Sequence, residues 1–263
     1  MIDFPGYTET NDQQQRTSCW QRKALQEGVP VAYPQGTGLP LSFSAGDYCC
    51  DTGVFPPRDD VQFAKDVAAK VKGMLHAGAS TWKVYASGLS NGGALAHNLA
   101  CEATQEFQGI AAVSQTFAKK PGHVCLDGNE SRMPIIDFRA IGDTVIPYHG
   151  GPSGPTLWTE SWLSAAESRQ AWSATLGCRS TQPTSVVYKN RIATVYTGPT
   201  SGPDMEQYTH CERMDCNTPF VQCSIVSGHV LYNNATAAGI DVCDAAWKFF
   251  GEKSAVWNGP LLP

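Results

Sequence analysis

The sequence is short of charge, and the charges that it has do not cluster. Charged residues make up 16% of the 263 positions, the formal net charge is -5, and no run of lysine or arginine occurs. The isoelectric point is near 5.6. Such a chain has no basic patch for a nucleic acid or an anionic membrane surface. No apolar stretch approaches the roughly 20 residues that a membrane-spanning helix needs. The composition therefore predicts a soluble protein with neither nucleic acid nor membrane as its partner.

The ten cysteines lack the close C-x-x-C spacing that is typical of structural zinc sites. An even number of cysteines in a lightly charged chain instead predicts several disulfides and an oxidising compartment. The N-terminus has neither the basic start nor the apolar core of a signal peptide. Two glycosylation sequons, at Asn129 and Asn234, are compatible with a secretory route. We expect a secreted protein without a bound metal, whose signal peptide is not present in this chain.

The hydrophobic pattern alternates between short apolar runs and longer segments with helical spacing. No internal repeat or low-complexity segment interrupts it, so a single domain over residues 1–263 is predicted. Because strands alternate with helices, the sheet is expected to be mostly parallel and covered by helices on both faces. The expected strands are 28–33, 82–86, 110–114, 134–138 and 219–226, with a hairpin at 184–197 that turns at Lys189-Asn190. The expected helices are 59–76, 94–101, 161–176 and 240–250, and the expected loops are 34–54 and 147–157.

One motif stands where a strand passes into a helix. Gly88-Leu89-Ser90-Asn91-Gly92 matches G-x-S-x-G, which holds a nucleophilic serine on a tight turn. Glycines two residues before and after the serine avoid a clash across that turn. The helix that follows directs its free N–H groups toward an oxyanion that forms at the serine. The motif predicts Ser90 as a nucleophile, against the alternative of a glycine-rich turn that contains a serine by chance.

A nucleophilic serine needs a base, and the base needs an acid that orients it. In sheets of this type the acid and the histidine follow the serine in the chain, each after a later strand. Asp143 meets this condition better than Asp137, which lies inside the strand. His229 follows the last predicted strand, whereas His149 shares the loop of Asp143 and is the rival. The remaining histidines fit less well: His76, His97, His123 and His210.

These segments together resemble the secreted feruloyl esterases and polyhydroxybutyrate depolymerases, which share an α/β-hydrolase fold. The matching stretches cover most of the chain in the order of the family: Pro5-Gly6-Tyr7-Thr8-Glu9-Thr10, Tyr33-Pro34-Gln35-Gly36-Thr37, Cys49-Cys50, Asp59-Asp60-Val61, Gly88 to Gly93, Leu99-Ala100-Cys101, Asp143 to Tyr148 and Gly228-His229. The resemblance implies a three-layer sandwich with a mostly parallel central sheet, and a triad of Ser90, Asp143 and His229. It also implies hydrolysis of carboxylic esters outside the cell with no cofactor.

Two departures from the family concern the start of the chain. The family has several strands before an oxyanion loop written His-Gly-x, whereas this chain begins almost at that loop and carries Pro5 in place of the histidine. The resemblance therefore implies a fold that lacks the first strands. If Gly6-Tyr7 still forms the loop, the N–H groups of Tyr7 and Asn91 hold the oxyanion.

The predicted substrate is a feruloyl or acetyl ester of plant polysaccharide or a polyhydroxyalkanoate polyester, bound by a monomeric enzyme. Among the aromatic residues of the loops, Tyr48, Trp158 and Trp162 are predicted to line the substrate cleft. Two alternatives stay open. One is a secreted protein that binds polysaccharide or polyester without turnover, because its oxyanion site is incomplete. The other is a serine peptidase of the same fold.

Overall fold

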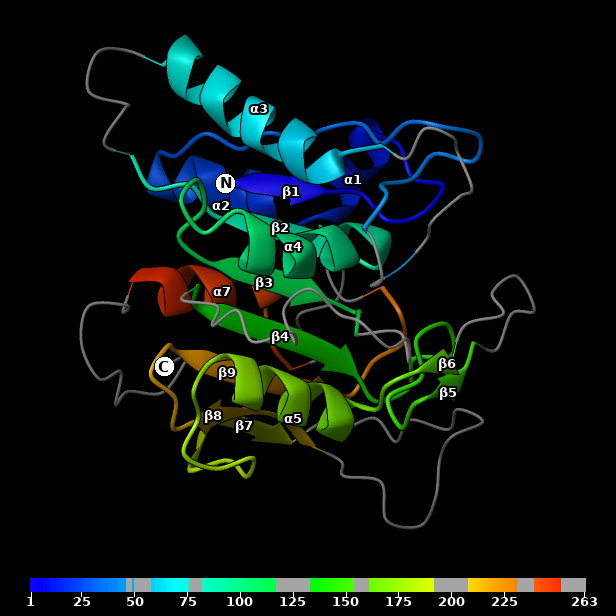
Figure 1. The fold of residues 1–263 in the computed structure, drawn as a ribbon, viewed down its shortest axis with the longest axis vertical. Coiled ribbons are helices and arrows are strands. Elements are labelled where there is room, and N and C mark those ends of the chain that lie inside the picture. Colours follow the sequence, from blue (N-terminus) through cyan, green and yellow to red (C-terminus); the bar gives the residue numbers. More distant parts are fainter. Residues whose placement is uncertain are drawn as a thin grey trace.

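The computed structural model describes residues 1–45, 49, 58–75, 82–116, 133–153, 161–191, 208–230 and 239–251. A seven-stranded sheet, in the order β1-β2-β3-β4-β9-β8-β7, runs through the centre of the molecule (Figure 1). The first five strands in this order pair in parallel, and β8 and β7 continue the sheet antiparallel. The strands are β1 (Ile2–Phe4), β2 (Ala86–Leu89), β3 (Ile110–Val113), β4 (Ile135–Ala140), β7 (Ser185–Arg191), β8 (Tyr208–Met214) and β9 (Phe220–Ile225), with a separate pair of β5 (Gly151–Pro152) and β6 (Ser161–Trp162).

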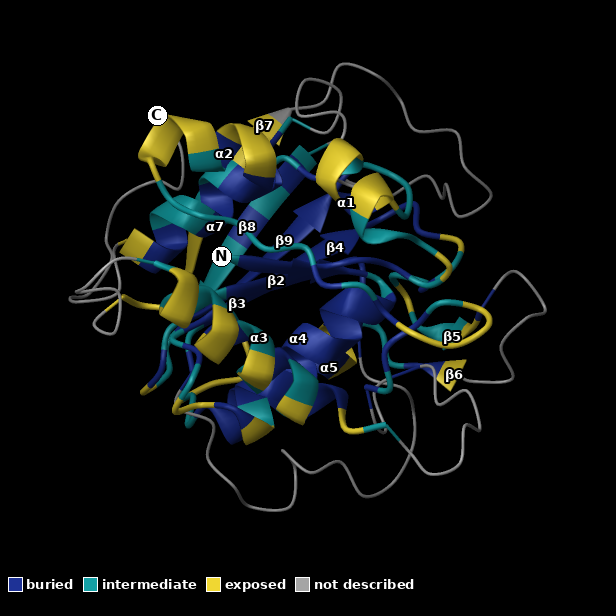
Figure 2. Cartoon of the chain, turned by 90° about the horizontal axis from the view of Figure 1, so that it is seen from above, coloured by how far each residue is buried: buried dark blue, intermediate teal, exposed yellow. Residues whose placement is uncertain are grey.

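Helices cover both faces of this sheet and produce three layers, as the view from above shows (Figure 2). The helices α3 (Asp60–Met74), α4 (Asn91–Glu102) and α5 (Ala165–Thr175) lie on one face. The other face carries α2 (Trp20–Glu27) and α7 (Val242–Gly251), and α1 (Asn11–Thr17) lies beside β1. The predicted three-layer α/β sandwich with a mostly parallel sheet is confirmed.

The buried strands supply one core to each helical layer, because successive side chains of a strand point to opposite faces. Ile110 and Ala112 of β3 pack in the core beneath α3, α4 and α5. Ala111 and Val113 of the same strand pack in the core beneath α2 and α7. All ten residues from Asn91 to Ala100 of α4 are buried, which places this helix against the middle of the sheet.

Two of the covering helices begin at side-chain caps. The Asp59 carboxylate accepts a hydrogen bond from the backbone N–H of Gln62 at the start of α3, and Ser164 with Glu167 forms a capping box at the start of α5. Leu176 caps the end of α5, and Gly177 follows it with a φ of 64°, a left-handed conformation that favours glycine. These signals explain why α3 and α5 lie close to their predicted ranges.

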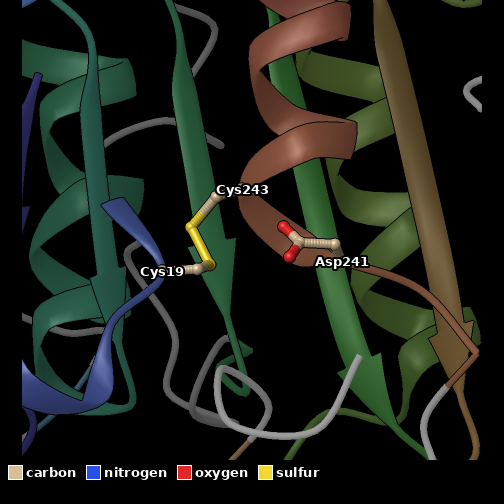
Figure 3. Close-up of side chains that lie close together, drawn as sticks. All are labelled: Cys19, Asp241 and Cys243. Carbon is tan, nitrogen blue, oxygen red and sulfur yellow. A yellow bond between two sulfur atoms is a disulfide. The ribbon is translucent and has the colours of Figure 1, made fainter. Parts of the chain in front are cut away.

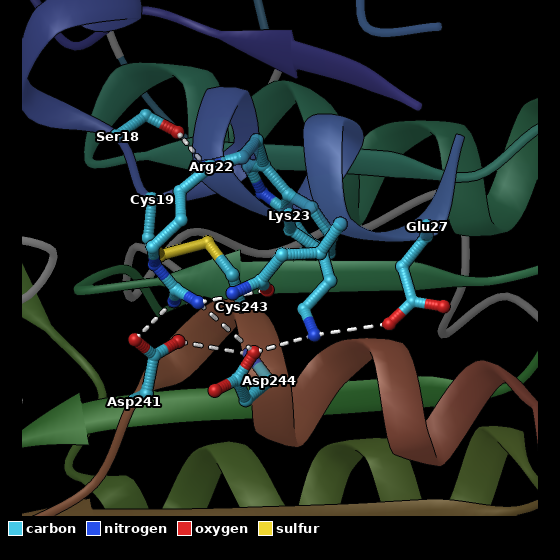
Figure 4. Close-up of polar contacts among 10 residues, drawn as sticks. Ser18, Cys19, Arg22, Lys23, Glu27, Asp241, Cys243 and Asp244 are labelled. Carbon is cyan, nitrogen blue, oxygen red and sulfur yellow. Dashed lines mark hydrogen bonds and ion pairs between the residues drawn. A yellow bond between two sulfur atoms is a disulfide. The ribbon is translucent and has the colours of Figure 1, made fainter. Parts of the chain in front are cut away.

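The helices α2 and α7, far apart in the sequence, are joined covalently and by ion pairs. Cys19 and Cys243 form a disulfide across a sequence separation of 224 residues. Figure 4 shows Arg22 and Lys23 of α2 reaching toward Asp241 and Asp244 at the start of α7, and Lys23 Nζ lies 2.7 Å from Asp244 Oδ1. In the chain-entropy model, a cross-link that closes so long a loop contributes about 5.4 kcal/mol.

Further disulfides confirm the prediction from the cysteine count. Cys178 pairs with Cys216, and Cys211 of β8 pairs with Cys223 of β9, to which it lies directly opposite. Cys49 and Cys101 are disulfide-bonded as well.

Several sequence predictions are wrong in detail. Residues 28–33 form no strand: only Ala32 makes an isolated bridge, to Ile2. The strand expected at 82–86 runs instead from Ala86 to Leu89, so it continues up to the serine motif. Residues 185–191 are one strand that pairs with β8, with a shift of register between Val186 and Tyr188, and Lys189-Asn190 is therefore no hairpin turn. The two helices between residues 11 and 27 were not predicted, because polar residues dominate that segment. The strand β1 was not predicted either, because it has only three residues.

Candidate active site

Ser90 stands on a strained turn between β2 and α4. It is half-buried, its φ of 53° is unusual for a residue with a side chain, and α4 begins at the next residue. The flanking glycines are required by contact: a Cβ on Gly88 would lie 2.3 Å from the carbonyl of Gly92. A Cβ on Gly92 would lie 2.1 Å from the carbonyl oxygen of Phe4 in β1. The turn thus has the geometry that the motif predicts.

His229 and Asp143 form a hydrogen-bonded pair. The distance between His229 Nδ1 and Asp143 Oδ2 is 2.7 Å, and the side chains are 19% and 1% exposed. The second oxygen, Asp143 Oδ1, accepts 2.8 Å hydrogen bonds from the backbone N–H groups of Val145 and Ile146. The carboxylate is therefore fixed by its own loop while it faces the imidazole. His149, the rival histidine, is exposed and stacks edge-on against Tyr148.

Backbone hydrogen bonds place the turns that carry these residues side by side. Ser90 N–H donates to Val113 C=O, and Ser114 N–H donates to Phe138 C=O, each at 2.8 Å. Farther along the sheet edge, Gly142 N–H donates to Ser227 C=O at 3.0 Å. The strands before these turns are parallel neighbours, so Ser90, Asp143 and His229 all follow carboxyl ends at one edge of the sheet. Ligands of open parallel sheets bind at this edge.

Within the described part of the chain, no hydrogen bond joins Ser90 Oγ to His229. If the hydrogen on Nδ1 points to Asp143, Nε2 of His229 is left as the acceptor that a serine hydroxyl requires.

The loop after β1 lies beside the serine turn, as the predicted oxyanion site requires. Phe4 of β1 pairs with Gly88 of β2, so the residues that follow both strands are neighbours. The Gly6 N–H donates to Glu9 Oε2 at 2.9 Å, which fixes the loop that contains Tyr7. Asn91 is the first residue of α4, where backbone N–H groups have no partner within the helix.

Sequence reasoning missed a contact that ties a second loop to the serine turn. The buried Asn91 side chain accepts a 2.7 Å hydrogen bond from Phe43 N–H and donates a 2.9 Å hydrogen bond to Phe43 C=O. The side chain of Asn91 thus anchors the loop, while only its backbone N–H is available to an oxyanion. No local sequence signal indicates this pair, since the two residues are 48 positions apart.

Of the three aromatic residues predicted to line the cleft, only Trp162 lies within the described residues. Trp162 is 1% exposed, packs in the core beneath α4 and α5, and donates a 2.7 Å hydrogen bond from Nε1 to Ser153 Oγ. Its contacts are those of a core residue. Tyr48 and Trp158 lie outside the described residues.

Among the described residues, one group brings three metal-ligating side chains together: Cys19, Asp241 and Cys243, with donor atoms within 4.8 Å of one another. Figure 3 shows that the two sulfurs are bonded to each other while the carboxylate lies beside them. Metal ions bind the thiolate form of cysteine, which a disulfide does not offer. The group therefore does not fit a metal site in this oxidised state.

A serine on a strand-to-helix turn, followed by an aspartate and a histidine at the same edge of a mostly parallel sheet, defines an α/β-hydrolase fold. The acetyl xylan esterase of Aspergillus awamori has a similar structure, with a TM-score of 0.60 at 13% identity over 95% of this chain and 87% of that one. Among curated proteins, feruloyl esterase B of Piromyces equi is 26% identical over 164 residues, which are 60% of this chain and 28% of that protein.

A second curated relative is NocK of Nocardia uniformis subsp. tsuyamanensis, whose name describes it as a candidate esterase. It is 29% identical over 145 residues, which are 55% of this chain and 40% of that protein. This chain thus matches less than half of the length of either curated relative. No family model matches the sequence. The predicted resemblance to esterases with the α/β-hydrolase fold is confirmed. No helix of the described segments could cross a bilayer.

Proposed function

We propose that this protein is a secreted serine esterase that hydrolyses carboxylic esters through an acyl-enzyme. The observation that carries the proposal is the 2.7 Å hydrogen bond between His229 and Asp143, at the sheet edge where Ser90 stands on its strained turn. His229 Nε2 takes the proton of Ser90 Oγ as that oxygen attacks the ester carbonyl. The N–H groups of Tyr7 and Asn91 stabilise the oxyanion.

The remaining steps return the enzyme to its starting state. The imidazolium of His229, stabilised by Asp143, gives its proton to the oxygen of the leaving alcohol, which leaves the acyl group on Ser90. Water then attacks the acyl carbonyl while His229 takes a proton from it. Ser90 Oγ departs with that proton, and the free acid is released. Every proton passes through one imidazole, so no cofactor is required.

The names of the similar proteins favour feruloyl or acetyl esters of plant polysaccharide as substrates. Polyhydroxyalkanoate polyesters remain a second substrate class, since the same chemistry cleaves them. The disulfides agree with an oxidising, extracellular location.

The test is a substrate panel of methyl ferulate, acetylated xylan, a polyhydroxybutyrate film and a chromogenic short-chain ester. We expect hydrolysis of the chromogenic ester and of at least one plant ester, and its loss in Ser90→Ala. Retained hydrolysis in Ser90→Ala would refute the serine mechanism. Binding of polysaccharide or polyester without product would instead favour the non-catalytic alternative.

A further inference from the structure

The loop after β1, which carries the predicted oxyanion residue Tyr7, is a tight turn in an uncommon conformation. The backbone N–H of Glu9 donates to Gly6 C=O at 3.2 Å, which closes a turn over residues 6–9. Thr8, the third residue of this turn, has a φ of 67°. A left-handed conformation is rare for a β-branched residue, and such strain persists only where the surroundings impose it. The contacts around the turn show what imposes it here.

The Glu9 side chain closes the turn a second time. Its Oε2 accepts a 2.9 Å hydrogen bond from the N–H of Gly6, which is buried, while Glu9 is half-buried. Gly6 is thus held at its N–H by the side chain of Glu9 and at its C=O by the backbone of Glu9. In a planar trans peptide, the Tyr7 N–H points opposite to the Gly6 C=O. Glu9 therefore sets the direction of the Tyr7 N–H.

Gln35 holds the same loop from a second segment of the chain. Its Oε1 accepts a 2.8 Å hydrogen bond from Asn11 N–H, and its Nε2 donates a 3.3 Å hydrogen bond to Glu9 C=O. Leu41, in the same segment as Gln35, accepts a 2.8 Å hydrogen bond at its C=O from Thr8 N–H. The turn and the residues that follow it are thus tied to one neighbouring segment.

The segment that holds the turn also holds the serine side of the site. Phe43, two residues after Leu41, is bonded through its N–H and its C=O to the side chain of Asn91, at 2.7 and 2.9 Å. Asn91 and Tyr7 are the two residues whose N–H groups stabilise the oxyanion in the proposed mechanism. Residues 35–43 therefore connect the two halves of the oxyanion site. Such donors act only where they are already aimed at the developing charge, so this connection bears on catalysis.

We propose that Glu9 and Gln35 are positioning residues of the esterase reaction: they hold the turn at residues 6–9 so that the Tyr7 N–H points at the oxyanion. The inference rests on the proposed function. Both side chains act through the backbone of the loop, so their loss weakens binding of the transition state and leaves binding of the substrate nearly unchanged. We therefore expect kcat to fall while KM stays.

The first experiment measures kcat and KM for the chromogenic ester, and the melting temperature, in Glu9→Ala, Glu9→Gln and Gln13→Ala. Gln13 is the matched control, because its Oε1 accepts a 2.8 Å hydrogen bond from Thr10 N–H, three residues back, as Glu9 does from Gly6. In Glu9→Ala we expect kcat to fall by about 10- to 100-fold, the cost of a misplaced group, with KM within about twofold. Glu9→Gln, which keeps an acceptor oxygen, and Gln13→Ala should both stay within about threefold of the wild type.

Three results with these variants would overturn the proposal. The first is an unchanged kcat in folded Glu9→Ala. The second is an equal loss in Glu9→Gln, because the charge and not the hydrogen bond would then matter. The third is an equal loss in Gln13→Ala, because any weakened bond near the loop would then have the same effect.

Gln35→Ala keeps the proposal testable if Glu9→Ala does not fold. This variant loosens the turn from the other segment, since it removes the hydrogen bonds to Asn11 and to the backbone of Glu9. We expect the same pattern, a lower kcat with KM within about twofold of the wild type. A wild-type kcat in folded Gln35→Ala, or a loss that appears in KM alone, overturns the proposal.

A trifluoromethyl ketone tests the oxyanion site directly. Ser90 Oγ bonds to the ketone carbon, the carbonyl oxygen becomes an oxyanion, and His229 keeps the hydroxyl proton. In Glu9→Ala the Ki of this inhibitor should rise by the factor by which kcat/KM falls, whereas the Ki of the matching alcohol, which forms no oxyanion, should stay. A constant Ki for the ketone overturns the proposal. If Ser90→Ala stays active, the proposed function itself fails. If Ser90→Ala is inactive and Glu9→Ala is unaffected, only the positioning role fails.

Discussion

Two serines that follow neighbouring strands share an uncommon backbone conformation but differ in their surroundings. Ser90 follows β2 with φ 53°, and Ser114 follows the adjacent β3 with φ 52°. Ser114 is 1% exposed, its Oγ forms no hydrogen bond within the described segments, and no helix begins after it there. Ser90 is half-buried, lies between two glycines that cannot hold a Cβ, and precedes α4.

The comparison separates backbone strain from function. A positive φ occurs at both positions, so strain alone does not mark a nucleophile. What differs at Ser90 is the close approach of β1 at Gly92 and the helix N-terminus directly behind the serine. The helix N-terminus offers a place for negative charge next to Ser90, whereas the two described residues that follow Ser114 begin no helix.

Removing the hydroxyl of Ser90 and that of Ser114, one at a time, tests the comparison most directly. For Ser90→Ala we expect a loss of about 10⁶-fold in kcat, the size seen when a triad nucleophile is removed. Ser114→Ala deletes a buried oxygen without a described partner, and we expect kcat within about threefold of the wild type. Steady-state kinetics with the chromogenic ester measures both. A similar loss in both variants would mean that the region acts through folding rather than through Ser90.

The next largest effect concerns the hydrogen-bonded pair of Asp143 and His229. Asp143→Asn keeps the size of the side chain but loses the charge and the preference for one tautomer of His229. We expect a fall of about 10⁴-fold in kcat with little change in thermal stability. Parallel measurements of kcat and melting temperature decide the matter. A melting temperature that collapses along with activity would contradict a specific role in orienting His229.

The close approach at Gly92 predicts a loss of stability. In Gly92→Ala the new Cβ would lie 2.1 Å from the Phe4 oxygen, so strand and helix must separate. We expect the free energy of unfolding to fall by more than about 4 kcal/mol, as for other severe core clashes. The control is Gly73→Ala in α3, where a Cβ meets nothing within 4 Å. Gly73→Ala should raise the free energy of unfolding by about 0.5–1 kcal/mol. Denaturant unfolding that ranks the two the other way would refute the packing argument.

The smallest expected effect belongs to the acid in β4. Because the pKa of Asp137 is about 6 when folded and near 3.8 when unfolded, the folded protein binds the extra proton between these values. Stability from this group is complete below about pH 4 and is lost as pH rises toward 6, a total of about 3 kcal/mol. In Asp137→Asn the fall in the free energy of unfolding between pH 4 and 6 should disappear, even if the substitution changes stability by the same amount at every pH. Unfolding free energies measured from pH 4 to 7 test it, and an unchanged slope would contradict the prediction.

The sequence predicted the parts of this molecule that local patterns encode. The caps and apolar spacing place α3, α5 and α7 within a few residues, and the glycine pattern locates the serine turn. The pair of Asp143 and His229 followed from chain order, and the structure brings these two side chains into contact. Their roles, and that of Ser90, stay predictions until the variants are measured.

The rest depended on contacts that no local pattern records. β1 has only three residues, and its pairing with β2 decides that it is a strand. The turn predicted at Lys189-Asn190 was overridden by pairing with β8, which lies later in the chain. The buried charges of β4 had a visible signal, since Asp137 and Arg139 interrupt an apolar run, but their partners come from α4, β9 and the loop after β3.

The disulfide between Cys19 and Cys243 turns most of the polypeptide into a ring. A protease that cuts one peptide bond between these positions yields two pieces that stay attached, and a non-reducing gel shows them as a single band. The fragments separate only after reduction. A single cut in an oxidising medium would therefore leave all the strands of the sheet covalently connected. Cut molecules would keep both of their fragments until the disulfide is reduced.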